Sequence, residues 1–412
     1  MSSVKRAVTR EELAQPTVPY EEAIARVIAA FEQLPPVTVP VGDALGLVLA
    51  ADVVADIDVP GFDSSAMDGY AVRSTDLRGA SKETPVSLRI EGDLPAGAQP
   101  GEAVEPGSCA KIMTGGPIPP GADAIVPWED TAPDAPEGTV AILVEQPSGK
   151  HIRPAGEDMR AGRRMLAAGT TLRPLHLGVI AMLGWTGVQV VPQPRVSVLS
   201  TGEELVQPGG ALREGQVYDS NQTLLAALAT AGGATVVRSG SVGDDPDAVS
   251  AWLHAAADVS DLIVTSGGAS VGEHDWMREV LARDGELMMW RVAMKPGKPV
   301  VFARAGGVPV LGLPGNPGSV YAGAHTFVLP AIRALAGRDP RPRAYAARLA
   351  TAVKGSPSRT LLCRVTLEDD LATPLPAQSS VVLSNLLPAH GYAIVPPGGL
   401  SEGAEVRVEL LD

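Results

Sequence analysis

Residues 196–205 read VSVLSTGEEL, an apolar run that ends in Ser-Thr-Gly and two glutamates. The apolar part, 196–199, is bounded by turn residues and predicts a short buried strand. Helix-like and strand-like patterns alternate after it, at 221–231, 235–237, 246–257, 262–265, 300–302 and 308–311. This alternation predicts an α/β domain with parallel strands and crossover helices, and ligands then bind at the carboxyl ends of the strands.

The length of 412 residues favours several domains around that one. We expect a multidomain α/β and β protein, in which a three-layer α/β domain with a parallel sheet stands beside a split helical domain, an inserted β-rich domain and a C-terminal β-barrel-like domain. The expected bounds are 10–59 with 154–190 for the split helical and linker domain, 60–153 for the insertion, 191–337 for the α/β domain and 338–412 for the C-terminal domain.

Two helices are expected in the first part of the chain. Apolar residues recur at helical spacing over residues 20–34, and Pro19 suits the first turn of such a helix. Pro35 and Pro36 should end it. A second, short helix is expected at 43–51.

Composition excludes several functions. The formal net charge is −14, which disfavours sequence-general nucleic-acid binding. Cys109 and Cys363 have no zinc-like or disulfide-like spacing, and the six histidines are scattered. The first twenty residues lack the apolar core of a signal peptide, and no apolar run reaches the length of a membrane span. We therefore expect a soluble cytoplasmic protein.

Three loops that follow predicted strands combine glycines with hydroxyl groups, at 200–202, 265–275 (TSGGASVGEHD) and 313–319 (LPGNPGS). Glycines let the backbone approach a phosphate closely, and hydroxyls can donate to it. The spacing matches neither the Walker loop nor GxGxxG. Flexible connectors are the alternative, but positions at strand ends favour binding. The predicted substrate-binding residues are Ser200, Thr201, Gly202, Ser266, Gly267, Gly268, Ser270, Pro314, Gly315, Asn316 and Pro317.

Charged groups accompany these loops. Arg291, Lys295 and Lys298 gather in RVAMKPGKP, where Pro and Gly restrict the backbone; a charged surface hairpin is the alternative reading. Mg²⁺ prefers oxygen ligands and bridges to substrate phosphates. A carboxylate buried beside the Ser-Thr-Gly loop would need a cation or a proton. The predicted metal-binding residues are Glu204, Asp244 and Asp275.

Two motifs lie outside the α/β region, DVPGFDSSAMDGYAV at 58–72 and KIMTGGPIPPGAD at 111–123. Taken alone, the first favours a solvated turn and the second a Gly-Pro turn.

Taken together, the loops, cations and carboxylates of the α/β region predict a nucleotide- or phosphate-binding α/β protein that uses Mg²⁺, either a transferase or a hydrolase.

The sequence also closely resembles MoeA-type proteins and the matching domain of gephyrin-like proteins. Eight segments occur in the order found in that family, from about residue 21 to residue 330: PGFDSSAMDGYAVR, KIMTGGPIPPGADAIV, RPAGEDM, LSTGEEL, GQVYDSN, SGGASVGEHD, AMKPGKPV and GLPGNPGS. The resemblance implies a molybdopterin molybdenumtransferase, which inserts molybdate into adenylylated molybdopterin and releases AMP with the help of Mg²⁺. It also implies four domains and a homodimer with the cleft between subunits. Transient contact with the molybdopterin adenylyltransferase and with molybdoenzymes would follow.

The functional positions that the resemblance implies are Asp68, Thr114, Asp158, Glu204, Asp244, Asp275, Arg291, Lys295, Lys298, Pro314 and Pro317. The cations are expected to hold molybdate or phosphate, and the hydroxyl and glycine loops to hold the pterin phosphate and the nucleotide. Glu204, Asp244 and Asp275 are expected to position Mg²⁺ or an attacking water. Arg291 stands where many relatives have Lys, and because Arg is larger and planar its role is open.

Two alternatives remain. A related molybdopterin adenylyltransferase or a nucleotide hydrolase of the competence-damage type would keep the Ser/Gly loop, but both would lack the motifs at 58–72 and 111–123, which are present here. A scaffold of the gephyrin kind is disfavoured because no long linker or disordered tail is visible.

Overall fold

The computed structural model describes residues 16–268 and 276–411. The chain forms two compact units. Unit 1 holds the described residues up to 38 together with 46–50 and 189–411, and unit 2 holds 39–45 and 51–188. The finer division into four domains stays a prediction. In the described part of the chain, no helix combines the length and the apolarity needed to cross a membrane.

Unit 1 contains the predicted α/β sheet, with six strands in the order β17-β14-β18-β22-β21-β19. The first four strands run parallel, namely β17 (Thr235–Val242), β14 (Arg195–Thr201), β18 (Leu262–Ser266) and β22 (Val308–Leu313). The parallel strands are extended at one edge by two antiparallel pairings: β21 (Val301–Ala305) pairs with β22, and β19 (Gly285–Met289) pairs with β21. The first pairing follows a two-residue turn at Gly306 and Gly307, whose φ angles of 55° and 83° suit a tight hairpin between β21 and β22.

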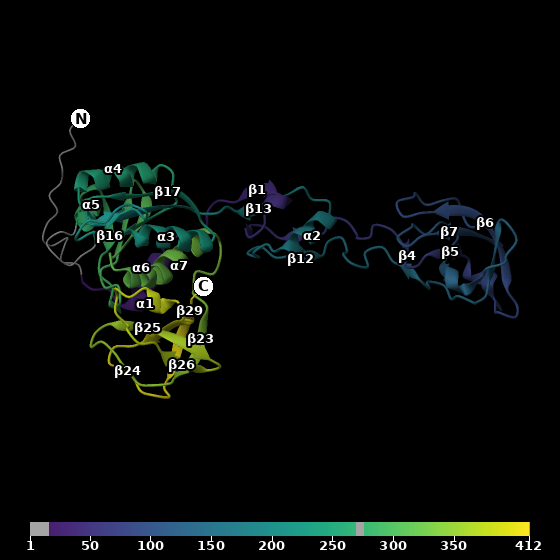
Figure 1. The fold of residues 1–412 in the computed structure, drawn as a ribbon. Coiled ribbons are helices and arrows are strands. Elements are labelled where there is room, and N and C mark those ends of the chain that lie inside the picture. The colour runs from purple at the N-terminus through teal and green to yellow at the C-terminus, as the bar shows by residue number, and fades with distance from the viewer. Residues whose placement is uncertain (1–15, 269–275, 412) are drawn as a thin grey trace. The chain divides into compact units, whose positions relative to one another are not determined.

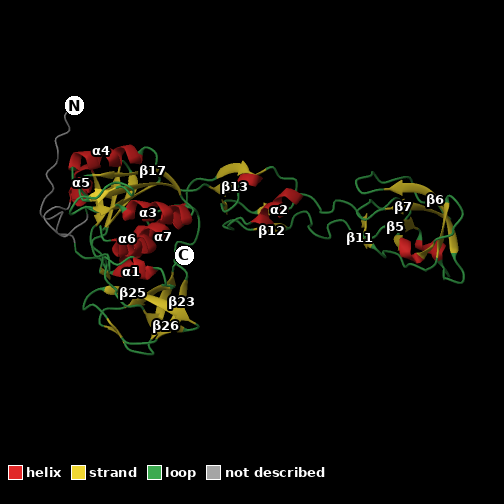
Figure 2. Ribbon diagram, viewed as in Figure 1, coloured by secondary structure: helices red, strands yellow, loops and turns green. Residues whose placement is uncertain are grey.

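Helices cover both faces of this sheet, which gives the predicted three layers (Figure 2). One face packs against α1 (Tyr20–Ile28), α3 (Ser220–Ala231), α6 (Pro317–Gly323) and α7 (Leu329–Leu335), and a π-helical turn (Ala324–Val328) joins the last two. The other face packs against α4 (Pro246–Ala257) and α5 (Trp276–Asp284). Each face has its own apolar cluster.

The C-terminal part of unit 1 is a closed barrel-like sheet, as predicted (Figure 1). Its order is β25-β26-β23-β29-β27, and β27 closes the ring on β25. The strands are β23 (Ala344–Leu349), β25 (Thr360–Glu368), β26 (Leu371–Pro374), β27 (Gly391–Val395) and β29 (Glu405–Leu410), with a small ribbon of β24 (Val353–Lys354) and β28 (Gly399–Leu400). Strand β20 (Met294–Lys295) pairs in parallel with β25, so a lysine predicted for the α/β site lies on the edge of the barrel sheet.

Unit 2 is β-rich over the predicted insertion. Its main sheet has the order β8-β5-β7-β6-β10-β9. The strands are β5 (Gly69–Val72), β6 (Val86–Leu94), β7 (Ser108–Ile112), β8 (Ala124–Pro127), β9 (Thr131–Ala132) and β10 (Thr139–Ile142). A second ribbon pairs β4 (Ser64–Ser65) with β11 (Ile152–Arg153), and this pairing fixes the DSSAMDGY loop.

Helical content around the insertion is lower than predicted. Helix α1 ends at Ile28 rather than at residue 34, and the other helix is α2 (Pro174–Met182). The helix expected at 43–51 was wrong: a 3-10 turn (Val41–Asp43) is followed by Gly46 at φ 79° and by β2 (Val48–Leu49). Strand β2 forms by pairing with Val190 and Val191. These partners lie far along the chain, so the local sequence pattern does not predict the strand. The remaining short strands are β1 (Val37–Pro40), β3 (Val53–Val54), β12 (Arg164–Leu166), β13 (Gly187–Val191), β15 (Leu205–Val206) and β16 (Val217–Tyr218).

Candidate functional site

The predicted binding loops of unit 1 meet at the carboxyl ends of three neighbouring strands. Ser200 on β14 pairs in register with Ser266 on β18, which pairs with Leu313 on β22. The Gly267 N–H donates to the Leu313 carbonyl at 3.1 Å. Thr201 lies against Gly267, and its buried hydroxyl has no hydrogen-bond partner among the residues that the structure describes. The structure therefore places these predicted residues together. Ser270 and Asp275 lie outside the described residues.

Gly267 is the tightest point of this junction. Its φ is 88°, a conformation that favours glycine, and a Cβ there would lie 2.2 Å from the Thr201 carbonyl oxygen. Gly268, at φ 64°, would bring its own Cβ to 3.0 Å from the Thr201 hydroxyl. Both positions therefore favour glycine, because a side chain at either one would crowd Thr201.

Replacing Gly267 by alanine should destabilise unit 1 by about 2 kcal/mol or more, because backbone strain of ~1–3 kcal/mol adds to the clash with Thr201. Gly243→Ala is the matched control, since Gly243 directly follows strand β17 of the same sheet and its Cβ would meet only ordinary contacts, at 3.7 Å or more. Thermal unfolding measures both variants. Equal unfolding midpoints for the two would contradict the assignment of strain to this loop.

The LPGNPGS motif begins α6 and is held by the start of α3. The Asn221 side chain donates to the Gly315 carbonyl at 2.7 Å. Asp219 caps α3 by accepting from the Gln222 N–H and also accepts from the Ser200 hydroxyl, both at 3.0 Å. Asp219 and Asn221 are buried. Neither residue is among the predicted site residues, although the motif GQVYDSN contains both.

A cavity of about 900 Å³ opens beside that motif, between the α/β part of unit 1 and the barrel. Four cationic side chains line it: Lys295, Lys298, Lys354 and Arg359. Pro314, Asn316 and Ser380 add further lining. A second cavity of about 850 Å³ shares Lys298 and Arg359 with it and is also lined by Tyr20 and Glu21. Two predicted cations thus meet two from the barrel in a pocket suited to an anion.

Lys354, Arg359 and Ser380 were missed in the sequence. They lie more than fifty residues after Lys298 and carry no local motif. The β20–β25 pairing explains their proximity, because it brings Lys295 opposite Leu361, two residues after Arg359. The sequence does not indicate that pairing, so it could not predict these residues as part of the site.

Arg291 takes a different position from the two predicted lysines. Its guanidinium carbon lies 3.7 Å from the centroid of the Trp290 ring, and Trp290 is buried. Arg291 is absent from the described residues that line either cationic cavity. Stacking on an indole is a contact that Arg makes better than Lys.

The two described carboxylates of the predicted metal set follow neighbouring strands. Glu204 comes after β14 and Asp244 after β17, and these strands pair Thr201 with Val242. Both side chains are exposed, so water can solvate Glu204 and no cation is required to offset burial. Within residues 16–268 and 276–411, no group of three or more His, Cys, Asp or Glu could hold a metal ion.

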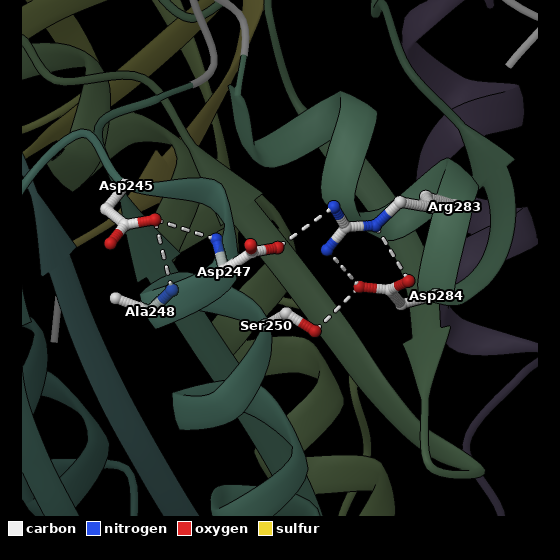
Figure 3. A network of polar contacts seen from close by, with 6 residues as sticks. All are labelled: Asp245, Asp247, Ala248, Ser250, Arg283 and Asp284. Atoms are coloured by element: carbon white, nitrogen blue, oxygen red, sulfur yellow. Dashed lines mark hydrogen bonds and ion pairs between the residues drawn. The ribbon is translucent and has the colours of Figure 1, made fainter. Parts of the chain in front are cut away.

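Asp244 is set apart from its neighbour by the capping of α4. Asp245 accepts from the Asp247 N–H at 2.9 Å and from the Ala248 N–H at 3.4 Å (Figure 3). Arg283 on α5 then contacts Asp247 at 3.3 Å and Asp284 at 2.6 Å (Figure 3). The Arg283 hydrogen bond lowers the pKa of Asp284 below its usual range. Asp245 thus caps the N-terminus of α4, and Asp244 takes no part in this capping interaction.

Unit 2 holds the other predicted residues. Asp68 accepts from the Thr114 N–H at 2.7 Å and from the Thr114 hydroxyl at 2.8 Å. These two bonds, the backbone one foremost, lower the pKa of Asp68 below its usual value. Asp158 is exposed, and its N–H donates to the Val59 carbonyl at 3.0 Å. The DSSAMDGYAV and KIMTGG motifs are therefore joined by an ionised aspartate rather than forming independent turns.

Replacing Thr114 by valine should raise the pKa of Asp68 towards its ordinary value, because one donor to the carboxylate is lost and the N–H remains. Asp68 would then be neutralised at a higher pH than in the unmodified chain. Titration of its carboxyl carbon by NMR measures the shift. The control is Thr139→Val, which removes a hydroxyl that donates to a carbonyl. Identical Asp68 titration in both variants would contradict this origin of the shift.

Comparison with known proteins covers nearly the whole chain. Residues 18–184 match the MoeA N-terminal region (domain I and II), residues 197–334 a "probable molybdopterin binding domain", and residues 346–411 the MoeA C-terminal region (domain IV). The chain is 39% identical over 402 residues to molybdopterin molybdenumtransferase 2 of Mycobacterium tuberculosis, which covers 95% of this chain and 98% of that protein.

Further relatives agree. A molybdopterin molybdenumtransferase of Staphylococcus aureus (strain Mu50) is 32% identical over 392 residues, covering 95% of this chain and 89% of that protein. The crystal structure of a molybdopterin biosynthesis MoeA protein from Pyrococcus horikoshii superposes with a TM-score of 0.83 at 34% identity, covering 96% of this chain and 99% of that one. The matches at both ends of the chain disfavour the adenylyltransferase and hydrolase alternatives. The chain belongs to the MoeA family.

Proposed function

We propose that this protein inserts molybdenum from molybdate into adenylylated molybdopterin and releases AMP with Mg²⁺, as the last step of molybdenum cofactor biosynthesis. Membership of a family of molybdopterin molybdenumtransferases makes the chain a transferase of that biosynthesis. The observation that carries the finer proposal is the cavity with four cationic side chains beside the Ser/Gly loops.

Molybdate fits this cavity by charge. A dianion needs cations or hydrogen-bond donors around it, and lysine ammonium groups act on oxyanions as point charges while Arg can bind two oxygens. We assign molybdate to Lys295, Lys298 and Arg359. Lys354 lies at the same cavity and would add to the attraction of the anion.

The strand-end loops are assigned to the remainder of the substrate. Thr201 offers a buried hydroxyl that no described residue bonds, and Gly267 and Gly268 allow close approach of the backbone. These groups would hold the pterin phosphate and the nucleotide. Binding both parts in one site would bring the dithiolene of the pterin to the cationic cavity.

Glu204 and Asp244 fit Mg²⁺ through their chemistry, as exposed oxygen ligands that follow adjacent strands at the same sheet edge. Asp275 is assigned with them on the strength of the family motif. A bound Mg²⁺ would neutralise phosphate charge as the phosphoanhydride is cleaved. The chain's own part is to hold these carboxylates where the phosphates lie, and one of them would orient the attacking water. Asp68, Thr114 and Asp158 remain proposed contributors from unit 2.

We also propose a homodimer. Helix α2 is apolar on most of its surface, yet Leu175 is 75% exposed and Met182 50% exposed. A second copy of the chain is the proposed cover for these side chains. Light scattering of the purified protein would test this, because a monomeric mass would exclude it. A cytoplasmic location and transient contact with the adenylyltransferase and with molybdoenzymes belong to the same proposal.

The test of function is AMP release from adenylylated molybdopterin. We expect release to require both molybdate and Mg²⁺. Release that proceeds equally without molybdate would favour a nucleotide hydrolase. Absence of release under all conditions would exclude the proposed reaction.

A further inference from the structure

Arg364 on β25 is a cation buried without an opposite charge. It is 1% exposed. Its guanidinium donates to the carbonyls of Ala377, at 3.5 Å, and Ser379, at 3.2 Å, and to the side-chain oxygen of Asn385. All of these acceptors are uncharged, and none of the ion pairs among the described residues includes Arg364. Burial of an uncompensated charge is costly, so this cation requires an explanation.

The backbone of Arg364 holds the same segment of chain. Its N–H donates to the Gln378 side chain at 2.9 Å, and its carbonyl accepts from that side chain and from the Leu375 N–H, both at 2.9 Å. We call residues 375–380 the wall segment, because four of its residues line the 900 Å³ cavity. Arg364 therefore stands directly behind one wall of the cationic cavity.

The wall segment is also tied to the LPGNPGS motif. Ser380 accepts from the Gly318 N–H at 2.9 Å through its carbonyl and from the Asn316 side chain at 3.2 Å through its hydroxyl. A Cβ on Gly318 would lie 2.4 Å from the Arg364 Nη2 atom. Arg364 is thus packed against the start of α6 as well as against the wall. A change at Arg364 would be transmitted to both sides of the cavity.

We propose that Arg364 is a positioning residue for the anion site, and that the oxyanion bound in the cavity is the opposite charge that the buried guanidinium lacks. This inference rests on the proposed function, because it takes an oxyanion as the occupant of the cavity. The guanidinium does not line the cavity; it acts through the wall segment. Its charge is screened little at that depth, so it attracts an anion across the wall.

Binding of molybdate, measured by calorimetry on the full chain, tests the inference with two substitutions. Arg364→Gln removes the charge and should weaken molybdate binding about tenfold or more. Arg364→Lys keeps the charge but replaces the planar guanidinium fork by a compact ammonium group, and should weaken binding by a smaller factor of about three. Arg348→Gln is the control, because Arg348 lies exposed on the same barrel, and binding should stay unchanged.

A second readout separates this role from a merely structural one. Molybdate should raise the Tm of the unmodified chain, and Arg364→Gln should reduce that increment. A lower Tm with an unchanged increment would overturn the proposal, and so would equal molybdate affinity of Arg364→Lys and the unmodified chain. The second comparison decides the matter even where Arg364→Gln fails to fold. Failure of the unmodified chain to bind molybdate would instead contradict the proposed function.

Discussion

Replacing Lys298 by alanine should lower kcat/KM for molybdate at least about thirtyfold, the largest effect that we expect from one cation. Lys298 lines both cationic cavities, so its ammonium group is shared by every proposed position of the anion. Truncating one partner of a desolvated charge pair costs ~2–5 kcal/mol, which corresponds to a factor of about thirty or more. The main-chain carbonyl of Lys298 accepts from Val292 and Val300, and those bonds survive the substitution.

The measurement is molybdate-dependent AMP release at varied molybdate concentration. Lys82→Ala is the control, because Lys82 is an exposed lysine of unit 2 outside both cavities. We expect Lys82→Ala to behave as the unmodified chain. Near-normal kcat/KM in Lys298→Ala, with the fold intact, would remove this lysine from the anion site.

Replacing Glu204 by glutamine should reduce turnover about a hundredfold or more if its carboxylate holds Mg²⁺ or orients water in the transition state. The side chain is exposed, so stability should change little. The carboxylate of Glu204 lies close to the backbone of Gly202, since a Cβ on Gly202 would lie 2.4 Å from the Glu204 Oε2 atom. Gly202 thus leaves room for the carboxylate to fold back over the strand end.

The neighbouring residue supplies a close control. Glu203 is also exposed, and Glu203→Gln makes the same chemical change one position earlier. Turnover at saturating substrate and Mg²⁺ should fall in the first variant and stay within about threefold in the second. Equal rates for the two variants would show that Glu204 has no special part in the reaction.

The α/β region was predictable because its signals are local. The apolar run of β14 and the helix pattern of α3 each occupy one stretch of sequence, and the rule that ligands bind at strand ends then placed Ser200 and Ser266 together. Features set by distant pairing were not predictable. Strand β2 depends on a partner far along the chain rather than on local pattern.

The anion cavity shows the same limit. Lys295 and Lys298 stand in one recognisable motif, whereas Lys354 and Arg359 reach them only after the barrel closes and β20 joins its edge. Arg364 carried no signal either, because it stands alone in the strand β25 and belongs to no motif. Motifs identified the chemistry, and tertiary pairing completed the site.

We propose that molybdenum transfer and AMP release are two results of one reaction on this chain. The most direct measurement incubates the purified protein with adenylylated molybdopterin, Mg²⁺ and molybdate, then quantifies both AMP and molybdenum bound to the pterin product. We expect AMP and pterin-bound molybdenum to rise together in equal amounts. AMP without molybdenum in the pterin product, or no AMP with molybdate present, would contradict it.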